Sequence, residues 1–282
     1  MDEGVKTDNI NNAAQSWSWI TSLSLVIVAI SYIFFLFKSG NIIGEINWLN
    51  AQIGFIGVLV MQLSADIFNE NHNKANKMLN YAVILLVVSI LIGLYLMLNT
   101  GWPLLIFLLI GVITVIFYRK LKAIGLGELL IYVCYAMAIP MSTAFVITEK
   151  ILWKMLLIGA PVGLHVLAIL QAANTHSLYR DKSAGILTQA TRLGLDGSQI
   201  VYQTFILAAY LLIAVLVTID LLHPISFLAL ISFPWANRNI KKMKSATERD
   251  LSCIATLDGD TAKVTLMFSL LLAIANIIAP YI

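Results

Sequence analysis

Two short polar clusters follow long apolar runs and carry the side chains best suited to chemistry. Each cluster places small oxygen-bearing side chains at relative positions 0, +3 and +7 and then continues with a lysine, Lys74 or Lys182. The oxygen-bearing residues are Asp66, Asn69 and Asn73 in the first cluster and Asn174, Ser177 and Asp181 in the second. At about 100° per residue these three positions lie within about 60° of one another, so each set lines one face of a helix.

Oxygen ligands without thiols favour Mg²⁺, which proteins commonly bind with a few oxygens together with substrate phosphates. Basic side chains beside such ligands would bind phosphate oxygens. The candidate diphosphate ligands are Lys74, Tyr118, Arg119, Lys120, Lys122, Arg180 and Lys182. A diphosphate chelated through Mg²⁺ would use both kinds of residue. Two plainer interpretations stay open: the clusters are solvated helix ends, and the basic loop 119–122 only orients the protein in a membrane.

Three further polar residues are weaker candidates for binding a second substrate. Gln62 lies one turn before Asp66, Gln171 lies near the Asn174 face, and Glu128 follows a Gly-Leu-Gly turn. Hydrogen bonding between helices is the alternative for the two glutamines. A capping role at a helix start is the alternative for Glu128.

The elements that position these clusters are membrane helices. The chain is 60% hydrophobic and 12% charged, whereas globular chains have about 45–50% apolar and about 25% charged residues. A spanning helix needs roughly 20 apolar residues. Nine apolar runs are present, of which the eighth is short: 19–37, 48–65, 79–98, 102–118, 129–147, 151–173, 200–222, 225–235 and 264–278. We therefore predict about nine transmembrane helices.

Basic residues predict the orientation of these helices. Of the 18 lysines and arginines, all but Lys38, Lys150 and Lys154 belong to one set of loops, a split of 15 to 3. Basic loops stay cytoplasmic, so we expect a cytoplasmic N-terminus, an external C-terminus, and cytoplasmic polar segments at 66–78, 174–199 and 236–263. Residues 1–18 are then a polar cytoplasmic N-terminus, and 19–282 form one transmembrane domain in the cell membrane.

The two clusters also suggest an internal repeat. Asp66 and Asn174 are 108 residues apart, an interval that covers four predicted helices. Two four-helix halves would bring the polar faces together at the mouth of a central cavity.

Several segments together resemble the UbiA superfamily of intramembrane prenyltransferases, and within it most nearly the 1,4-dihydroxy-2-naphthoate polyprenyltransferase branch. The likeness covers roughly residues 45–280. It is carried by Pro161-Val-Gly-Leu through Asn174, Tyr179-Arg-Asp181, Ala184-Gly185, Thr188 and Thr191-Arg-Leu-Gly194, by the stretch from Tyr118 to Gly125-Leu-Gly-Glu128, by Thr261-Ala-Lys-Val-Thr-Leu-Met-Phe, and by the position of residues 65–73.

The resemblance implies an all-α, nine-helix bundle with a central cavity and cytoplasmic cap loops. It also implies Mg²⁺-dependent transfer of a prenyl chain from an isoprenyl diphosphate to an aromatic or other lipophilic acceptor, as in quinone or lipid biosynthesis. Its partners would be these substrates and membrane lipid, with no nucleic acid.

The motifs depart from the family pattern. Where the family has Asn-Asp-x-x-Asp-x-x-x-Asp, this chain has Ala65-Asp66-x-x-Asn69-x-x-x-Asn73, and the second motif has Ala173, Asn174, Ser177 and Asp181. Asp66 and Asp181 are the carboxylates that remain, and we therefore expect them to be the catalytic pair. Fewer charges should weaken Mg²⁺ binding.

Two other functions fit the sequence. A membrane terpene cyclase on the same scaffold would ionise a prenyl diphosphate without a separate acceptor. A transporter or a non-catalytic lipid-binding protein is the alternative from another class. The helix centres are almost free of charge, which argues against a transporter.

Overall fold

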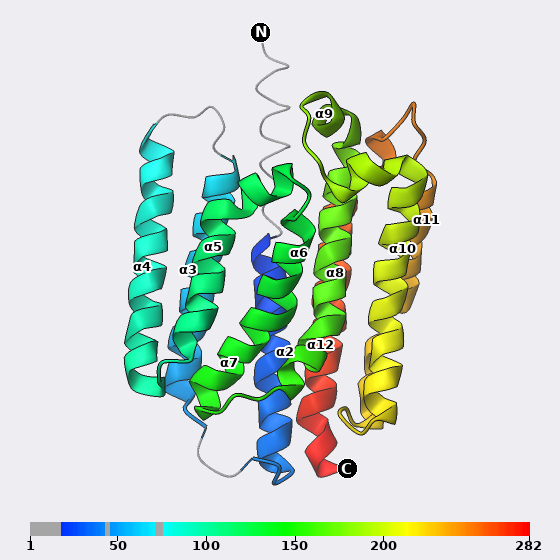
Figure 1. The fold of residues 1–282 in the computed structure, drawn as a ribbon. Helices are drawn as coiled ribbons and strands as arrows, with labels where there is room; N and C mark the ends of the chain where they lie inside the picture. The colour runs from blue at the N-terminus through cyan, green and yellow to red at the C-terminus, as the bar shows by residue number, and fades with distance from the viewer. Residues whose placement is uncertain (1–17, 43–45, 71–75) are drawn as a thin grey trace.

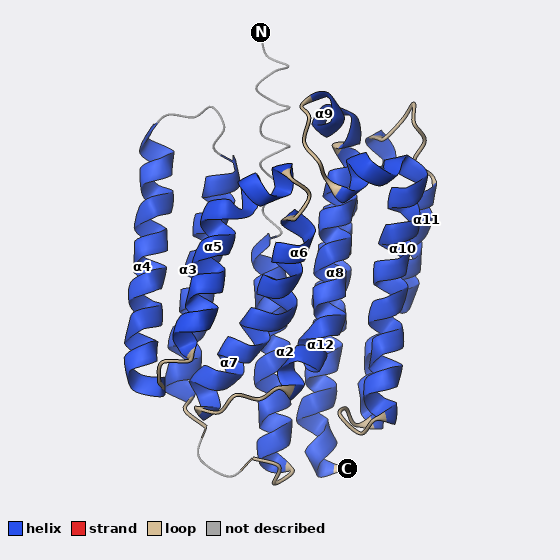
Figure 2. Ribbon diagram, in the orientation of Figure 1, coloured by secondary structure: helices blue, strands red, loops and turns tan. Residues whose placement is uncertain are grey.

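The computed structural model describes residues 18–42, 46–70 and 76–282. Within these ranges the regular elements are all helices, apart from an isolated bridge between Thr247 and Asp250 (Figure 2). Eight helices or helix series are long and apolar enough to cross a membrane. They are α2 (Ser18–Lys38), α3 (Trp48–Glu70), α4 (Asn76–Thr100), α5 (Leu104–Ala123), the series α6 (Gly127–Tyr132), η1 (Val133–Ala138) and α7 (Ile139–Thr148), then α8 (Lys154–His176), α10 (Gln189–Thr218) and α12 (Leu257–Ile278). This confirms an all-α membrane protein.

The short eighth apolar run forms a ninth, broken rod. It begins as the 3₁₀-helix η2 (Pro224–Ser232) and continues as α11 (Phe233–Lys244). Proline stands near the start of both segments, where its fixed φ and missing N–H are tolerated. The rod completes the expected nine-helix arrangement with a less regular member. Short helices η3 (Ser252–Ile254) and η4 (Ala279–Tyr281) flank α12.

The helices form two groups with α2 between them (Figure 1). One group contains α3, α4, α5 and the α6–η1–α7 series, and the other contains α8, α10, η2–α11 and α12. α2 packs against α3, α7, α8 and α12. The predicted interval of four helices therefore corresponds to two four-helix groups, and the first helix lies at their junction.

The fifth crossing changes helix type at its middle, where η1 is a π-helix. This segment packs closely on α8 because α8 presents glycines to it. A Cβ on Gly159 would lie 2.4 Å from the Ala136 carbonyl oxygen, and one on Gly163 would lie 2.3 Å from the Ala136 Cβ. Small residues commonly allow such close approach between membrane helices, and π-segments are frequent at functional sites. The packing fixes the positions of Glu128 and Tyr135 relative to α8.

The polar ends of α3 and α8 lie at the same end of the bundle (Figure 1). The short helix α9 (Leu178–Ser183) and the turn between α5 and α6 lie at that end as well. Both clusters thus belong to one face of the molecule, which we call the polar end.

Candidate active site at the polar end

The second cluster is organised around the carboxylate of Asp181, which is only 4% exposed. Ser177 Oγ donates a hydrogen bond of 3.2 Å to Asp181 Oδ2. Lys122 Nζ lies 3.9 Å from Oδ2, and Arg180 Nε lies 3.8 Å from Oδ1. Two cations therefore flank one buried carboxylate, a combination that can bind a phosphate and its metal ion together.

Glu128 joins three helices next to this carboxylate. Asn174 Nδ2 donates to Glu128 Oε1 over 3.1 Å, and the backbone N–H of Gln189 donates to the same oxygen over 3.0 Å. Gln189 is the first residue of α10, so Glu128 accepts one of the N-terminal backbone N–H groups of α10 while it lies in the first turn of α6. Because the amide nitrogen of Asn174 is used in this way, its carbonyl oxygen is the atom that a cation would bind.

Two glycines allow the α5–α6 turn to bring Lys122 and Glu128 into the cluster. Gly125 has φ +80°, and a Cβ there would lie 2.0 Å from Arg192 Nη2. Arg192 in α10 donates a hydrogen bond of 3.0 Å to the Ile124 carbonyl. This bond links the turn to α10. A Cβ on Gly127 would lie 3.0 Å from the Lys122 Cα. Sequence reasoning included Arg192 only as part of the Thr191-Arg-Leu-Gly194 segment and gave it no role at the site, although the Gly-Leu-Gly spacing marked the turn that it contacts.

The other predicted diphosphate ligands differ in burial and in how close they lie to Asp181. Tyr118 is half-buried one turn before Lys122, on the same helix face, and lies within electrostatic range of Glu128 and Asp181. Arg119 and Lys120 are exposed, and Lys120 Nζ lies 5.8 Å from the centre of the Phe117 ring. Lys182 is also exposed. Of the basic stretch 119–122, the structure thus brings Lys122 to Asp181.

The first cluster is described only in part. Asn73 and Lys74 lie outside the described residues, and the side chain of Asn69 is not described either. Asp66 accepts a hydrogen bond from Ser18 Oγ at 2.5 Å on Oδ2 and from Gln62 Nε2 at 2.9 Å on Oδ1. The carboxylate is therefore oriented by its own helix and by the first turn of α2.

Gln62 is the centre of a network that links α2, α3 and η1. Its Oε1 atom accepts from Ser22 Oγ at 2.9 Å and from the Tyr135 hydroxyl at 2.5 Å. This is the helix-to-helix bonding weighed against acceptor contact from the sequence. Sequence reasoning missed Ser18, Ser22 and Tyr135. The spacing of the two serines, one helical turn apart in an apolar run, was the available signal.

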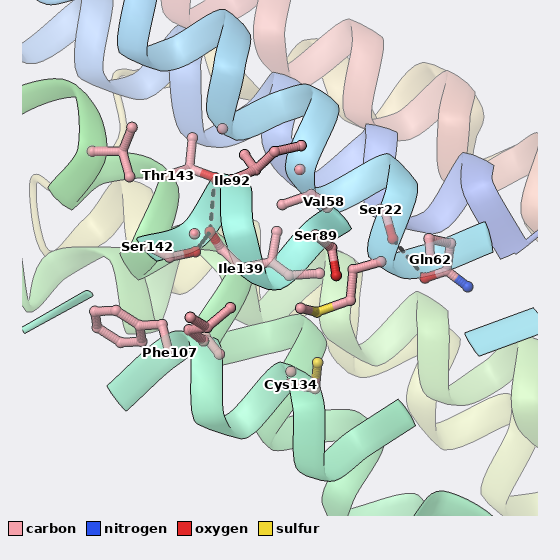
Figure 3. A pocket seen from close by; sticks show the side chains of 18 of the residues that line it. Ser22, Val58, Gln62, Ser89, Ile92, Phe107, Cys134, Ile139, Ser142 and Thr143 are labelled. Carbon is pink, nitrogen blue, oxygen red and sulfur yellow. Dashed lines mark hydrogen bonds between the residues drawn. The ribbon is translucent and has the colours of Figure 1, made fainter. Parts of the chain in front are cut away.

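An apolar cavity begins beside Gln62 and extends between α3, α4, α5 and α7 (Figure 3). It contains about 960 Å³ of space unoccupied by atoms, part of it open to the surroundings. Ser22 and Gln62 lie at one end of the view and Phe107, Ser142 and Thr143 at the other. Four glycines line it: Gly54, Gly57, Gly93 and Gly111. The cavity has the shape and polarity suited to an apolar chain.

Gln171 is the most unusual polar residue near the site. It is 1% exposed, and neither atom of its side-chain amide has a hydrogen-bond partner among the described residues. Such a buried, unpaired amide costs about 1–3 kcal/mol. His165, two turns earlier, is fully buried and lies 4.6 Å from the Phe268 ring, centre to centre. His165 therefore packs in the second helix group, whereas Gln171 retains free hydrogen-bonding capacity.

The donor set fits a hard divalent cation that arrives with its substrate. The described residues contain no group of three or more His, Cys, Asp or Glu that could hold a metal ion by themselves. Mg²⁺ usually needs only one or two carboxylates when substrate phosphates complete its coordination. Asp181, Asn174 and Ser177 offer a carboxylate, an amide oxygen and a hydroxyl within one cluster, and Asp66 offers a carboxylate at the same end.

The sequence matches the UbiA prenyltransferase family over residues 74–250, which is more than half of the chain. The chain is 29% identical over 164 residues to "UbiA prenyltransferase domain-containing protein 1" of Danio rerio, covering 57% of this chain and 45% of that protein. It is 25% identical over 196 residues to 1,4-dihydroxy-2-naphthoate octaprenyltransferase of Bacillus subtilis, covering 68% of this chain and 62% of that protein. The matches thus span about half the length of these relatives.

Solved structures share the fold at low sequence identity. A UbiA homologue from Aeropyrum pernix K1 superimposes with a TM-score of 0.67 at 12% identity, covering 93% of this chain and 98% of that chain. A UbiA homologue from Archaeoglobus fulgidus bound to Cd²⁺ gives a TM-score of 0.58 at 10% identity, covering 92% and 97%. The family match, the shared fold and the two polar clusters agree, and the chain belongs to the UbiA prenyltransferase family.

Proposed function

We propose that this protein transfers a prenyl chain from an isoprenyl diphosphate to a lipophilic aromatic acceptor in the membrane. The proposal rests on two environments at one end of the bundle, of which one is charged and the other is apolar. A cation-flanked carboxylate, Asp181, lies at the polar end. The apolar cavity begins at Gln62, which is bonded to the other motif carboxylate, Asp66. An isoprenyl diphosphate has a charged head and an apolar tail, and so needs both.

The diphosphate would bind at the polar end. Lys122 and Tyr118 present their polar groups from one face of α5, and Arg180 adds a guanidinium from α9. Arg119, Lys120, Lys182 and Lys74 would add positive charge around them. The proposed metal-binding oxygens belong to Asp66, Asn69, Asn73, Asn174, Ser177 and Asp181. Bound Mg²⁺ would neutralise the diphosphate and favour its departure.

The reaction exchanges one bond for another at the first carbon of the prenyl chain. The bond between this carbon and the diphosphate oxygen breaks, and its electron pair leaves with the diphosphate. Lys122 and Arg180 stabilise the charge that develops on the leaving oxygen. An electron-rich acceptor carbon attacks the cation-like allylic carbon and then loses its proton to the released diphosphate. The Tyr135 ring lines the start of the cavity, where an aromatic face can stabilise positive charge.

The acceptor would be held by hydrogen bonds from Gln171. Its amide is buried without a partner among the described residues, and it lies one turn before Asn174 in the metal cluster. An aromatic diol of the kind named for the Bacillus relative, which would make this a quinone-forming enzyme, offers the hydroxyl groups that an amide binds. Glu128 is a weaker candidate, because its Oε1 atom already accepts two hydrogen bonds.

The polar end would face the cytoplasm, with residues 1–18 on that side and the C-terminus outside. The basic loops support this orientation. The proposed unit of function is the single transmembrane domain 19–282.

The proposal can be tested with purified protein in lipid vesicles, Mg²⁺, labelled prenyl diphosphates and a dihydroxynaphthoate, with product mass read by mass spectrometry. Asp181→Asn keeps the shape of the side chain and removes its charge, and should lower turnover by about 100-fold or more. Asp196→Asn, an exposed position in the first part of α10, is the matched control and should leave turnover unchanged. Hydrocarbon products formed without acceptor would replace this function by a terpene cyclase. Absence of any product, with or without the dihydroxynaphthoate, would support a lipid-binding protein.

A further inference from the structure

Buried apolar side chains line the end of the cavity that is far from the polar site. Leu96, Leu104 and Val146 line it there and are 3%, 5% and 4% exposed. Phe145, 3% exposed, packs in the same cluster. The partly buried side chains of Ile53, Ile92, Met97 and Phe107 pack against this cluster. These tightly packed side chains form an apolar floor.

The depth of the cavity can be measured along α3, which lines its whole length. Lining residues run from Ala65, beside Asp66, to Ala51 near the floor. A Cβ on Gly54 would contact Val146 Cγ1 at 3.4 Å and Leu96 Cδ1 at 3.7 Å, so the floor lies at the level of Gly54. With a rise of about 1.5 Å per residue, the distance from Ala65 is roughly 16 Å to Gly54 and roughly 21 Å to Ala51.

An extended isoprene unit adds four backbone carbons, or about 5 Å with bonds of about 1.5 Å. The cavity therefore accommodates about three to four units below the diphosphate. We infer that this cavity is a blind-ended slot that limits the prenyl donor to farnesyl or geranylgeranyl diphosphate, an inference that rests on the proposed function. A tail of eight units would extend about 40 Å, well beyond the floor.

Glycines keep the slot open along its length. A Cβ on Gly57 would lie 2.9 Å from Ile92 Cγ2, one on Gly93 would lie 2.7 Å from Leu108 Cδ1, and one on Gly111 would lie 2.5 Å from Met61 Sδ. Ile92, Leu108 and Met61 themselves line the cavity. Larger residues at these glycines would push the lining side chains into the slot and narrow it. The width of the slot therefore also depends on glycine.

The experiment compares donors of two, three, four, six and eight isoprene units at equal concentration with one acceptor. Wild-type protein should use the three- and four-unit donors at least about tenfold better, by kcat/KM, than the eight-unit donor, because the longer tail has no space at the floor. Val58 lines the cavity about 10 Å from Ala65, close to the length of two units. Val58→Phe should therefore retain use of the two-unit donor and lose about tenfold or more with the four-unit donor.

Leu96→Ala opens the floor and should raise use of the six-unit donor about tenfold relative to wild type. Leu91→Ala is the matched control, since Leu91 lies on the same helix and is 60% exposed. It should leave the length preference unchanged. Melting temperature in detergent identifies any variant that fails to fold.

Equal use of all donor lengths by wild type, or an unchanged preference in both Val58→Phe and Leu96→Ala, would overturn the slot. Failure of every donor to react would instead overturn the proposed function. In that case thermal stabilisation by non-transferable thiolodiphosphates of the same lengths tests the slot separately: loss of stabilisation beyond four units supports it, and equal stabilisation by eight units refutes it.

Discussion

Replacing Gln62 with leucine should destabilise the protein by removing three hydrogen bonds that its side-chain amide makes. Gln62 donates to Asp66 and accepts from Ser22 and Tyr135, and it is 7% exposed. Hydrogen bonds between membrane helices contribute about 0.6 kcal/mol on average, and buried ones in water-soluble proteins about 1 kcal/mol. Three lost bonds therefore predict a decrease of about 2–3 kcal/mol in the free energy of unfolding.

A double-mutant cycle separates the network from simple loss of packing. Tyr135→Phe removes one of the three bonds and should cost about 1 kcal/mol. In the Gln62→Leu background the same change should cost almost nothing, because the partner of the hydroxyl is already absent. Unfolding free energies can be obtained by titrating SDS into mixed micelles and following far-ultraviolet circular dichroism.

Ser89→Ala is the matched control for this cycle. Ser89 also lines the cavity, but its Oγ donates to the Leu86 carbonyl of its own helix, so its loss should be nearly neutral. Strictly additive costs for Gln62→Leu and Tyr135→Phe, or a neutral Gln62→Leu, would refute the idea that Gln62 couples α2, α3 and η1.

Three further predictions follow from other parts of the site. Asn69→Asp restores a carboxylate to the first motif and should tighten Mg²⁺ or Mn²⁺ binding in the presence of diphosphate, measured by isothermal titration calorimetry; unchanged affinity would remove Asn69 from the metal site. Gly125→Ala should lower the free energy of unfolding by at least about 1 kcal/mol in the same SDS titration, because φ is +80° and Arg192 occupies the space of the new Cβ; a neutral substitution would contradict the turn geometry. A cysteine introduced at Ser183, in a background without Cys134 and Cys253, should resist an impermeant thiol reagent added outside intact cells; ready labelling would reverse the proposed orientation.

The helices were predictable because lipid requires continuous apolar runs, and such runs are visible in composition alone. The eighth run was too short for a regular span, and the structure resolves it into η2 and α11 at prolines. The π-segment Val133–Ala138 was not predictable. Its apolar sequence resembles that of the α-helices around it, and its geometry depends on contact with Gly159 and Gly163 of α8.

Spacing along the chain predicted the second cluster only in part. Asn174 lies on α8, but α8 ends at His176 and Asp181 belongs to the separate helix α9, so the three residues do not share one face of a single helix. The structure nevertheless links Ser177 to Asp181 directly. Contacts between distant segments were not predictable. Glu128 reaches Gln189 across 61 residues, and Tyr135 reaches Gln62 across 73. No local periodicity encodes such pairs, since they depend on how the helices pack.

The position of α2 at the junction of the two helix groups has a consequence for assembly. Asn276 Nδ2 in α12 donates to Ser31 Oγ in α2 over 3.2 Å, although 245 residues separate them. The buried hydroxyl of Ser31 in α2 therefore gains this partner only after α12 has been synthesised. During synthesis, one flank of α2 can already pack on α3 while the other remains exposed to lipid or to the insertion machinery. Closure of this side of the bundle thus requires α12, and nascent chains stalled before α12 should keep Ser31 accessible to crosslinking.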